Sequence, residues 1–331
     1  MRVVQRLEDL EPAPSVVTVG AFDGVHLGHQ ALIGQVVAMA RAMGWRSVVV
    51  TFFPHPAVVL RGEAPFYLTS PEEKRRRIAR LGVDVLVQMP FTRGTAQIRA
   101  ADFVERLVRI GMRALWAGPD FAMGHRREGT LAVLEALGRQ HGYTVHVAME
   151  FHLGGRPVRS SRIREALRQG DVRAAAEILG APFAVSGEVI AGAGRGRQWG
   201  IPTANLAIWP EHALPANGVY AGWADLPGGM RRMAVINIGV RPTFDQGSER
   251  TVEVHLLDWS GNLYGRRLMV HFIERLRGER RFPSVTELVA QIHQDITRAR
   301  TILEAAPLRT PVEEPEQGSD LPAGGPSAGR R

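Results

Sequence analysis

The feature that most restricts the fold of this chain is a regular alternation of strand and helix signals in its first half. Short β-rich runs are found at Ser15–Gly20, Ser47–Phe53, Asp84–Met89 and Arg113–Ala117. Helical spacing of apolar residues falls between these runs, at His26–Met43, Ser70–Leu81 and Ala101–Ile110. Ser70 is a good N-cap for the second of these helices, and Glu73 completes a capping box. Alternation at this spacing predicts a parallel sheet with helices on both faces.

The pattern changes after about Pro182. Short β-rich runs separated by Gly, Pro and Asn turns follow at Phe183–Ala191, Gly218–Asp225, Arg232–Ile238, Thr251–Leu257 and Arg267–Ile273. They predict a small antiparallel barrel, closed by a helix over Val285–Ala305. We therefore expect one domain over residues 1–182 and a second over residues 183–305. Residues 306–331 are rich in Pro, Gly, Glu and Ser, which predicts a disordered tail.

Composition limits the kinds of site that the chain can build. There is no cysteine, which rules out disulfides and thiolate metal sites. No apolar run approaches the ~18 residues that cross a bilayer, and Met1–Leu10 lacks the apolar core of a secretory signal. We therefore expect a cytoplasmic protein with no membrane partner. The formal charge is +8, but the basic residues are scattered, which favours small anionic substrates over nucleic acid. Because Lys74 is the only lysine, phosphates must be held by backbone N–H groups, Arg, His or a metal.

The most informative segment of the first half is Thr18–His29, which leaves a strand, turns through two glycines and opens a helix. His26 and His29 are three residues apart, so both imidazoles lie on one face of the first helical turn. Gly28 lets a ligand approach that turn closely. A helix N-terminus with two histidine donors predicts a phosphate site that needs no lysine. The alternative is that the two histidines only cap or pack the helix.

The second half has its own glycine loop, Gly187–Arg197, followed by the segment Gly200–Asn205. The loop is not a dinucleotide fingerprint, because its third glycine falls one residue early and no helix is expected after it. Thr203 and Asn205 present two oxygen ligands at alternate positions, which suits Mg²⁺ held together with ATP phosphates. A turn with a purely structural role is the alternative.

A later strand, Thr251–Leu256, places polar side chains on one face and apolar ones on the other. Thr251, Glu253 and His255 share the polar face. By pattern alone, such a face is more often simply exposed to solvent.

The form Gly-x-Phe-Asp-Gly-Val-His-Leu-Gly-His resembles the adenylyltransferase half of the bacterial bifunctional riboflavin kinase/FMN adenylyltransferase (FAD synthetase) family. Further matches follow in order at Thr51–Pro56, Leu68–Lys74, Gly118–Gly124 and Ser160–Arg164. The resemblance implies an α/β Rossmann-like nucleotidyltransferase domain in which His26 and His29 are catalytic, and Asp120 contacts the flavin or the nucleotide. It implies nucleotide phosphate contacts from Gly20, Phe22, Asp23, Gly28, Ser160, Ser161 and Arg164. Two positions depart from the family pattern: Ala21 stands where Asn is common, and Arg159 where a small hydroxyl residue is usual.

The segment Gly192–Asn205 resembles the riboflavin kinase half of the same family, and so do Gly218–Ala221, Asn237–Phe244 and Leu263–Gly265. The resemblance implies a six-stranded antiparallel Greek-key β-barrel with a C-terminal helix. It implies ATP contacts from Gly192, Gly194, Gly196 and Arg197, Mg²⁺ ligands in Thr203 and Asn205, and Glu253 as catalytic base. His255 is expected to be structural. The resemblance implies that the Arg241–Phe244 loop is mobile and helps to enclose the flavin, with a rigid hairpin as the alternative. Phe282 is expected to cover the flavin ring because it is aromatic.

The resemblance extends over about residues 15–305 and implies an enzyme of FAD biosynthesis. Riboflavin and ATP would give FMN at the barrel, and FMN and ATP would give FAD and pyrophosphate at the first domain, both steps with Mg²⁺. One alternative is a riboflavin kinase whose nucleotidyltransferase domain is silent, a reading that Ala21 keeps open. A basic nucleic-acid-binding protein and a non-catalytic flavin sensor are the others, although a sensor has no need of Thr203, Asn205 and Glu253 together. The sequence leaves a homo-oligomer open.

Overall fold

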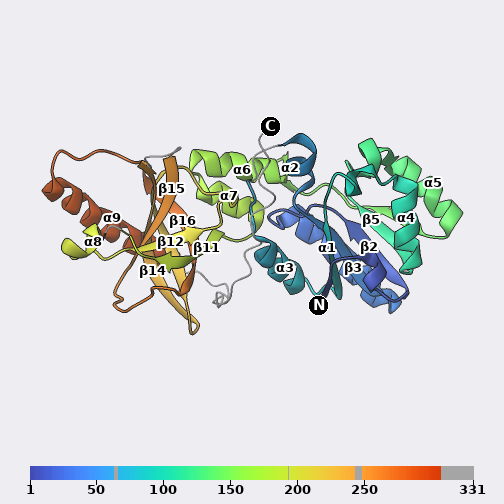
Figure 1. Cartoon of the computed structure of the whole chain (residues 1–331), viewed down its shortest axis with the longest axis horizontal. Helices are drawn as coiled ribbons and strands as arrows, with labels where there is room; N and C mark the ends of the chain where they lie inside the picture. The colour runs from blue at the N-terminus through green and yellow to red at the C-terminus, as the bar shows by residue number, and fades with distance from the viewer. Residues whose placement is uncertain (63–65, 193, 243–247, 307–331) are drawn as a thin grey trace. The chain divides into compact units, whose positions relative to one another are not determined.

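The computed structural model describes residues 1–62, 66–192, 194–242 and 248–306. Within these residues the chain divides into two compact units (Figure 1). The first consists of Met1–Arg162 and Ile178–Gly180, and the second of Ile163–Glu177 and the residues from Ala181 onward. Helices α6 (Ser160–Gln169) and α7 (Val172–Leu179) are therefore shared between the units, whereas the sequence predicts a single boundary after residue 182.

The first unit contains a six-stranded sheet whose strand order is β1-β4-β3-β2-β5-β8 and whose pairs are all parallel. The strands are β1 (Arg2–Val4), β2 (Ser15–Val19), β3 (Arg46–Phe53), β4 (Val85–Pro90), β5 (Met112–Ala117) and β8 (Thr144–Val147). The predicted parallel sheet is thus confirmed, with two edge strands more than the four runs that the sequence marks. The sequence does not mark these two edge strands because β1 spans only three residues, too few to show an alternating pattern, and because β8 is only partly buried.

Alternating side chains of the central strands form two separate cores, one on each face of the sheet. Val17, Val19 and Val50 face the side covered by α4 (Ala100–Arg109) and α5 (Leu131–His141). Val16 and Val49 face the side covered by α1 (Leu27–Met43) and α3 (Pro71–Arg80). The remaining short elements are α2 (Pro56–Arg61), β6 (Ala122–Met123), β7 (Gly129–Thr130), β9 (His152–Leu153), β10 (Arg156–Pro157) and 3-10 turns at Leu7–Asp9, Thr95–Gln97 and His125–Arg127.

The predicted helix starts agree with the local hydrogen bonds. The Ser70 hydroxyl accepts a hydrogen bond from the backbone N–H of Glu73 at 3.1 Å, and Pro71 occupies the first turn of α3. His26 precedes α1 as its N-cap, so the first helical residue is Leu27. The loop between β2 and α1 therefore opens at the carboxyl ends of the parallel strands, where α/β sheets bind ligands.

The second unit is a closed antiparallel barrel of six strands in the order β11-β12-β15-β14-β13-β16. The strands are β11 (Phe183–Ile190), β12 (Ala204–Ile208), β13 (Gly218–Leu226), β14 (Met230–Pro242), β15 (Ser248–Leu256) and β16 (Arg267–Arg277). The expected barrel is confirmed. β12 is the sixth strand, which the strand pattern of the sequence does not show. One helical turn, α8 (Arg195–Gln198), lies in the glycine loop where the sequence predicts no helix, so that expectation is wrong.

Aromatic rings fill the interior of the barrel, and the last helix, α9 (Val285–Ala305), covers part of its outside. Phe183, Tyr220 and Phe272 are fully buried, and the rings of Tyr220 and Phe272 meet edge to face at 5.4 Å. Ala299 and Leu303 of α9 belong to another apolar cluster, with residues of β13, β14 and β16 that point out of the barrel. α9 therefore packs against the outer face of the barrel.

Two sequence-based expectations concern other parts of the chain. The predicted tail lies outside the described residues from residue 307 onward. No helix in the described ranges combines the length and the apolar character needed to cross a lipid bilayer.

Candidate active sites

In the first unit, the loop from Gly20 to His26 brings the two predicted histidines together at the start of α1. The His26 Nδ1 accepts a hydrogen bond from the backbone N–H of His29 at 3.3 Å, and the two rings stack with 3.6 Å between their centroids. Because Nδ1 is the acceptor, a neutral His26 ring carries its proton on Nε2, which is then a donor. A side chain at position 20 would force the Phe22 ring to shift, since its Cβ would lie 2.8 Å from that ring.

The pKa of His29 lies well below the ordinary value for histidine. Burial is the main cause, and the neighbouring His26 and Lys74 lower it further. The His29 imidazole is therefore neutral at neutral pH. Phe22 meets it edge to face at 5.2 Å, so the predicted phosphate-site residue Phe22 contacts the histidine ring.

Asp23 ties this loop to a neighbouring segment of its own unit. Its carboxylate is buried and accepts hydrogen bonds from the backbone N–H of Leu68 at 3.0 and 3.2 Å. The backbone N–H of Gly24 in turn donates to the Thr69 hydroxyl at 3.3 Å. These contacts give Asp23 a visible structural role, and its predicted contact with the nucleotide stays a prediction.

The second predicted phosphate element, at the start of α6, reaches the same loop through one residue. The Ser160 hydroxyl donates to the backbone carbonyl of Asp23 at 3.0 Å. Ser161 is exposed beside it. Arg164 lies one turn further along α6, in the part of the helix that belongs to the second unit. The structure thus brings Ser160 to the histidine loop.

Asp120, the predicted flavin or nucleotide contact, forms an ion pair with a residue that departs from the family pattern. Arg159 places Nη2 2.8 Å from the Asp120 Oδ2 and 2.9 Å from the Glu150 Oε1. The Asp120 side chain is 76% exposed, so a ligand can still reach it.

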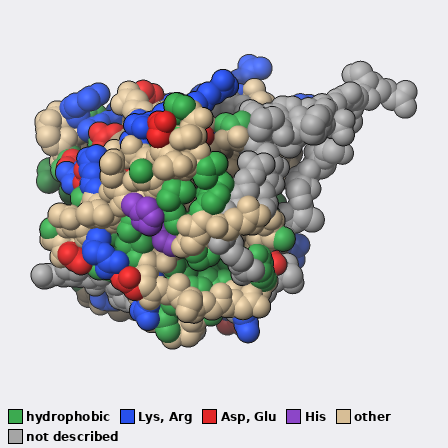
Figure 2. Space-filling view, turned by 90° about the vertical axis from the view of Figure 1, so that its left-hand side faces the viewer, with side chains coloured by type: hydrophobic (Ala, Val, Ile, Leu, Met, Phe, Trp, Pro, Cys, Tyr) green, Lys and Arg blue, Asp and Glu red, His purple; other side chains and the backbone are tan. Residues whose placement is uncertain are grey.

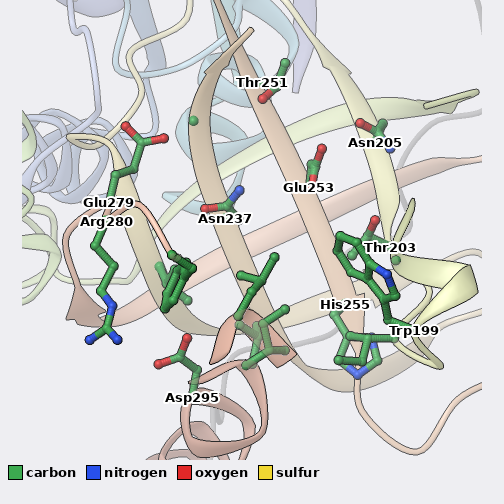
Figure 3. A pocket seen from close by; sticks show the side chains of 18 of the residues that line it. Trp199, Thr203, Asn205, Asn237, Thr251, Glu253, His255, Glu279, Arg280 and Asp295 are labelled. Carbon is green, nitrogen blue, oxygen red and sulfur yellow. The ribbon is translucent and has the colours of Figure 1, made fainter. Parts of the chain in front are cut away.

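In the second unit, a pocket of about 590 Å³ lies between the outer face of the barrel and α9 (Figure 3). On the polar wall of this pocket, Glu253 of β15 is the middle one of three polar residues on neighbouring strands. The register pairs Glu253 with Asn205 of β12 on one side and with Asn237 of β14 on the other. Val252 and Val254 point the opposite way and are buried. The polar face of β15 therefore lines a pocket.

The expected metal ligands Thr203 and Asn205 lie beside Glu253 and line the same pocket (Figure 3). Gly192 makes room for Asn205, because a Cβ at position 192 would lie 2.1 Å from the Asn205 Nδ2. Within the described residues no group of three or more His, Asp or Glu side chains could hold a metal ion. The hydroxyl and amide oxygens of Thr203 and Asn205 do fit Mg²⁺ that takes its other ligands from ATP phosphates.

The other predicted residues of this site fall into two groups. Gly194, Gly196 and Phe282 line the pocket, and the Arg280 guanidinium lies over the Phe282 ring at 4.5 Å from its centroid. Arg197 and Arg241 lie on α8 and β14, but their side chains are outside the described part of the structure, and so is the loop 243–247.

His255 belongs to the pocket as well as to the scaffold. It lines the pocket, and its Nδ1 lies 2.8 Å from the backbone carbonyl oxygen of Pro202. Because Pro202 immediately precedes Thr203, this contact fixes the segment that carries the expected metal ligands. The expectation of a structural histidine therefore has a specific contact to support it.

Asn237 and Asp295 are two pocket residues that the sequence reasoning misses. Asn237 shares the outward face of β14 with Val235, so strand alternation alone could have marked it. Asp295 follows Leu288 and Ile292 along the inner face of α9. Its carboxylate accepts hydrogen bonds from Arg277 Nε at 2.9 Å and Gln291 Nε2 at 3.0 Å. An acidic residue within the apolar face of a helix is the sequence feature that could have indicated Asp295.

The surface around the barrel carries both charge signs. In Figure 2, hydrophobic side chains and histidine lie together near the centre of the face shown, with acidic and basic side chains dispersed around them. This dispersion agrees with the scattered basic residues of the sequence. The expected lack of nucleic-acid binding stays a prediction.

Comparisons with known proteins identify the family. The FAD synthetase family model matches residues 8–162, and the riboflavin kinase family model matches residues 179–303. A bifunctional riboflavin kinase/FMN adenylyltransferase of Pseudomonas fluorescens is 37% identical over 93% of this chain and 99% of its own length. The same-named enzyme of Bacillus subtilis is 36% identical over 86% of this chain and 91% of its own length.

A solved structure shows the same fold. The crystal structure described as a macrolide-efflux protein from Streptococcus pneumoniae has a TM-score of 0.83 and 31% sequence identity, covering 90% of this chain and 98% of that one. The two family models follow each other in the order of the two units. The chain therefore belongs to the family of bifunctional riboflavin kinase/FMN adenylyltransferases.

Proposed function

We propose that this chain converts riboflavin to FAD in two steps at two separate sites. The barrel pocket phosphorylates riboflavin to FMN, and the histidine loop of the first unit joins FMN to the adenylyl group of ATP. The order of the two family models along the chain supports this division. The main support for this proposal is that Glu253 lies between Asn205 and Asn237 on neighbouring strands. This arrangement places one carboxylate among oxygen ligands in a pocket.

In the kinase step, Glu253 is the catalytic base. The nucleophile is a hydroxyl of riboflavin, which is a neutral alcohol. A carboxylate speeds the reaction because it accepts the hydroxyl proton while the γ-phosphoryl group is transferred. Thr203 and Asn205 would hold Mg²⁺, which would supply positive charge to stabilise the phosphates during transfer. Phe282 and the apolar residues Leu288 and Ile292 offer the flat flavin ring an apolar wall in the same pocket.

The adenylyl-transfer step needs no general base. The FMN phosphate is already an anion and attacks the α-phosphorus of ATP directly, so the protein acts by positioning and by stabilising charge on the departing pyrophosphate. His26, His29 and the first N–H groups of α1 supply hydrogen-bond donors. We assign Ser160, Ser161 and Arg164 to the same phosphates, Gly20, Phe22, Asp23 and Gly28 to the loop that surrounds them, and Asp120 to the flavin or the nucleotide.

For the barrel we assign Gly192, Gly194, Gly196 and Arg197 to ATP and Arg241 to the flavin, and we place the domain boundary after residue 182. We further propose that the enzyme works in the cytoplasm on these small substrates, without a nucleic-acid partner.

The test is a time course with purified protein, riboflavin, ATP and Mg²⁺, with flavins separated by chromatography. FMN that appears first and FAD that follows supports both assignments. FMN without FAD contradicts the proposed second step and points to Ala21 and Arg159. A chain that forms neither product contradicts the whole proposal, and retention on nucleic acid would then be measured against salt concentration.

A further inference from the structure

The only lysine of the chain has its ammonium group buried beneath the histidine loop. Lys74 lies in the first half of α3, and its side chain is buried. Its Nζ donates hydrogen bonds to the backbone carbonyls of Ala21 at 3.2 Å and Phe52 at 3.1 Å, and to the Thr51 hydroxyl at 3.2 Å. Three donors therefore meet three oxygen acceptors, which satisfies the ammonium fully.

Two of the three acceptors belong to one strand, and the third lies in the loop that follows the neighbouring strand. Ala21 lies in the loop that follows β2, whereas Thr51 and Phe52 lie at the carboxyl end of β3. In the same loop, Phe22 and Val25 adopt positive φ angles of 48° and 44°. Such conformations persist only where the surrounding structure holds them. The Lys74 ammonium is one of the groups that hold this loop to the next strand.

The burial of the ammonium brings its pKa closer to neutral pH. Burial lowers the pKa of Lys74 to about 8, and the nearby carboxylate of Asp23 opposes that shift. The positive charge of Lys74 in turn lowers the pKa of His29, after burial and His26. On its own helix, Glu73 pairs with Arg77, whose Nη1 donates to the Gly24 carbonyl at 3.2 Å. When Lys74 loses its proton, the loop loses one donor and one positive charge.

We propose that Lys74 is a positioning residue for adenylyl transfer. Its ammonium fixes the loop that carries His26 and His29, and it adds a buried positive charge on the side of the sheet where the nucleotide phosphates bind. The lysine of a P-loop contacts the phosphate itself. The Lys74 Nζ instead donates its hydrogen bonds to Ala21, Thr51 and Phe52, so it acts through the loop. This inference rests on the proposed function of the first unit.

The first experiment uses Lys74→Met in the full chain. We expect the kcat for FAD formation from FMN to fall about 100-fold, because small displacements of positioning groups cost that much. FMN formation from riboflavin in the same preparation should stay unchanged. Arg75→Met is the matched control, since Arg75 is the next residue of α3 and pairs with Glu72 at the surface. Full FAD formation by Lys74→Met would overturn the proposal.

A pH profile separates this role from a merely structural one. FAD formation by the unchanged chain should decline as the pH rises above about 8, where Lys74 loses its proton. The residual rate of Lys74→Met should not decline there, because the titrating group is gone. A decline that persists in Lys74→Met contradicts the proposal.

A third readout needs no variant. Because the chain has one lysine, protein made with ¹³C-lysine gives a single lysine Cε signal, which titrates without assignment. We expect a midpoint that matches the decline in FAD formation and that rises when ATP is added without FMN, because a nearby anion stabilises the ammonium. A midpoint that ATP does not move overturns the proposal, even if Lys74→Met fails to fold. An unchanged chain that forms no FAD at any pH contradicts the proposed function instead.

Discussion

Glu253 on β15 lies directly across from Asn205 on β12, so the expected base and an expected metal ligand of the kinase site are cross-strand neighbours. Residues paired in this way have their side chains on the same face of a sheet, about 5 Å apart at Cβ. The barrel register therefore holds these two groups together without any contribution from a loop. Asn237 on β14 is the cross-strand neighbour of Glu253 on the other side.

Replacing Glu253 by Gln should stop the first step and spare the second. Gln keeps the size of the side chain but cannot accept the hydroxyl proton, so the kcat for riboflavin phosphorylation should fall about 10²–10⁴-fold. FAD formation from supplied FMN should not change. The measurement is the initial rate of each step, with Glu188→Gln, at an exposed position of β11, as control. Equal losses in Glu253→Gln and Glu188→Gln would exclude a catalytic role for Glu253.

Replacing Gly192 by Ala should impair the kinase through Asn205. The new Cβ would lie 2.1 Å from the Asn205 Nδ2 and 2.6 Å from its Cγ, so the amide must move away from its present place. We expect riboflavin phosphorylation to fall at least about tenfold, with more Mg²⁺ needed for half-maximal rate. Gly34→Ala is the control, because nothing lies within 4 Å of that position. In α1 this control should stabilise the helix by about 0.5–1 kcal/mol. A normal Mg²⁺ requirement in Gly192→Ala would show that Asn205 is not a ligand.

The lowered pKa of His29 should make the first unit less stable in acid. Below about pH 6.5 the unfolded chain protonates this histidine while the folded chain does not. Stability therefore falls as the pH drops from about 6.5 toward the lower folded-state pKa, and His29→Gln should weaken this dependence. Hydrogen exchange of α1 amides between pH 7 and pH 5 measures it for this unit.

His152→Gln provides the comparison for His29→Gln, because about half of the His152 side chain is exposed in the folded chain. The His152 variant should keep the pH dependence of the unchanged chain. If both variants weaken the dependence equally, His29 is not its source.

The sequence predicts the parts of each site that follow from local spacing. The interval between His26 and His29 places both on the first helical turn, and β alternation puts Glu253 opposite Val252 and Val254. What local spacing cannot show is which distant segments meet. Arg159 pairs with Asp120 across 39 residues, and Lys74 reaches Thr51 across 23. β12 is missed for a similar reason, since its five residues become a strand only by pairing with β11 and β15.

A buried ion cluster should dominate the stability of the barrel. The Asp225 carboxylate, fully buried, binds Arg231 with Nε–Oδ1 at 2.5 Å, and its Oδ2 lies 3.0 Å from the His271 Nε2. Asp225→Asn would remove the negative charge that faces the buried Arg231 guanidinium, and breaking a buried ion pair costs about 3–5 kcal/mol. The free energy of opening, from hydrogen exchange of β13 amides, should fall by about that amount.

Asp258→Asn is the matched control for Asp225→Asn. Asp258 binds Arg300 through both oxygens at 2.7 and 2.9 Å, but its side chain is 71% exposed. Water solvates both partners there, so the loss should be far smaller. Asn also tolerates the positive φ of 54° at this position, so the backbone adds no strain. Equal losses for the two variants would mean that burial does not set the contribution of the Asp225 cluster.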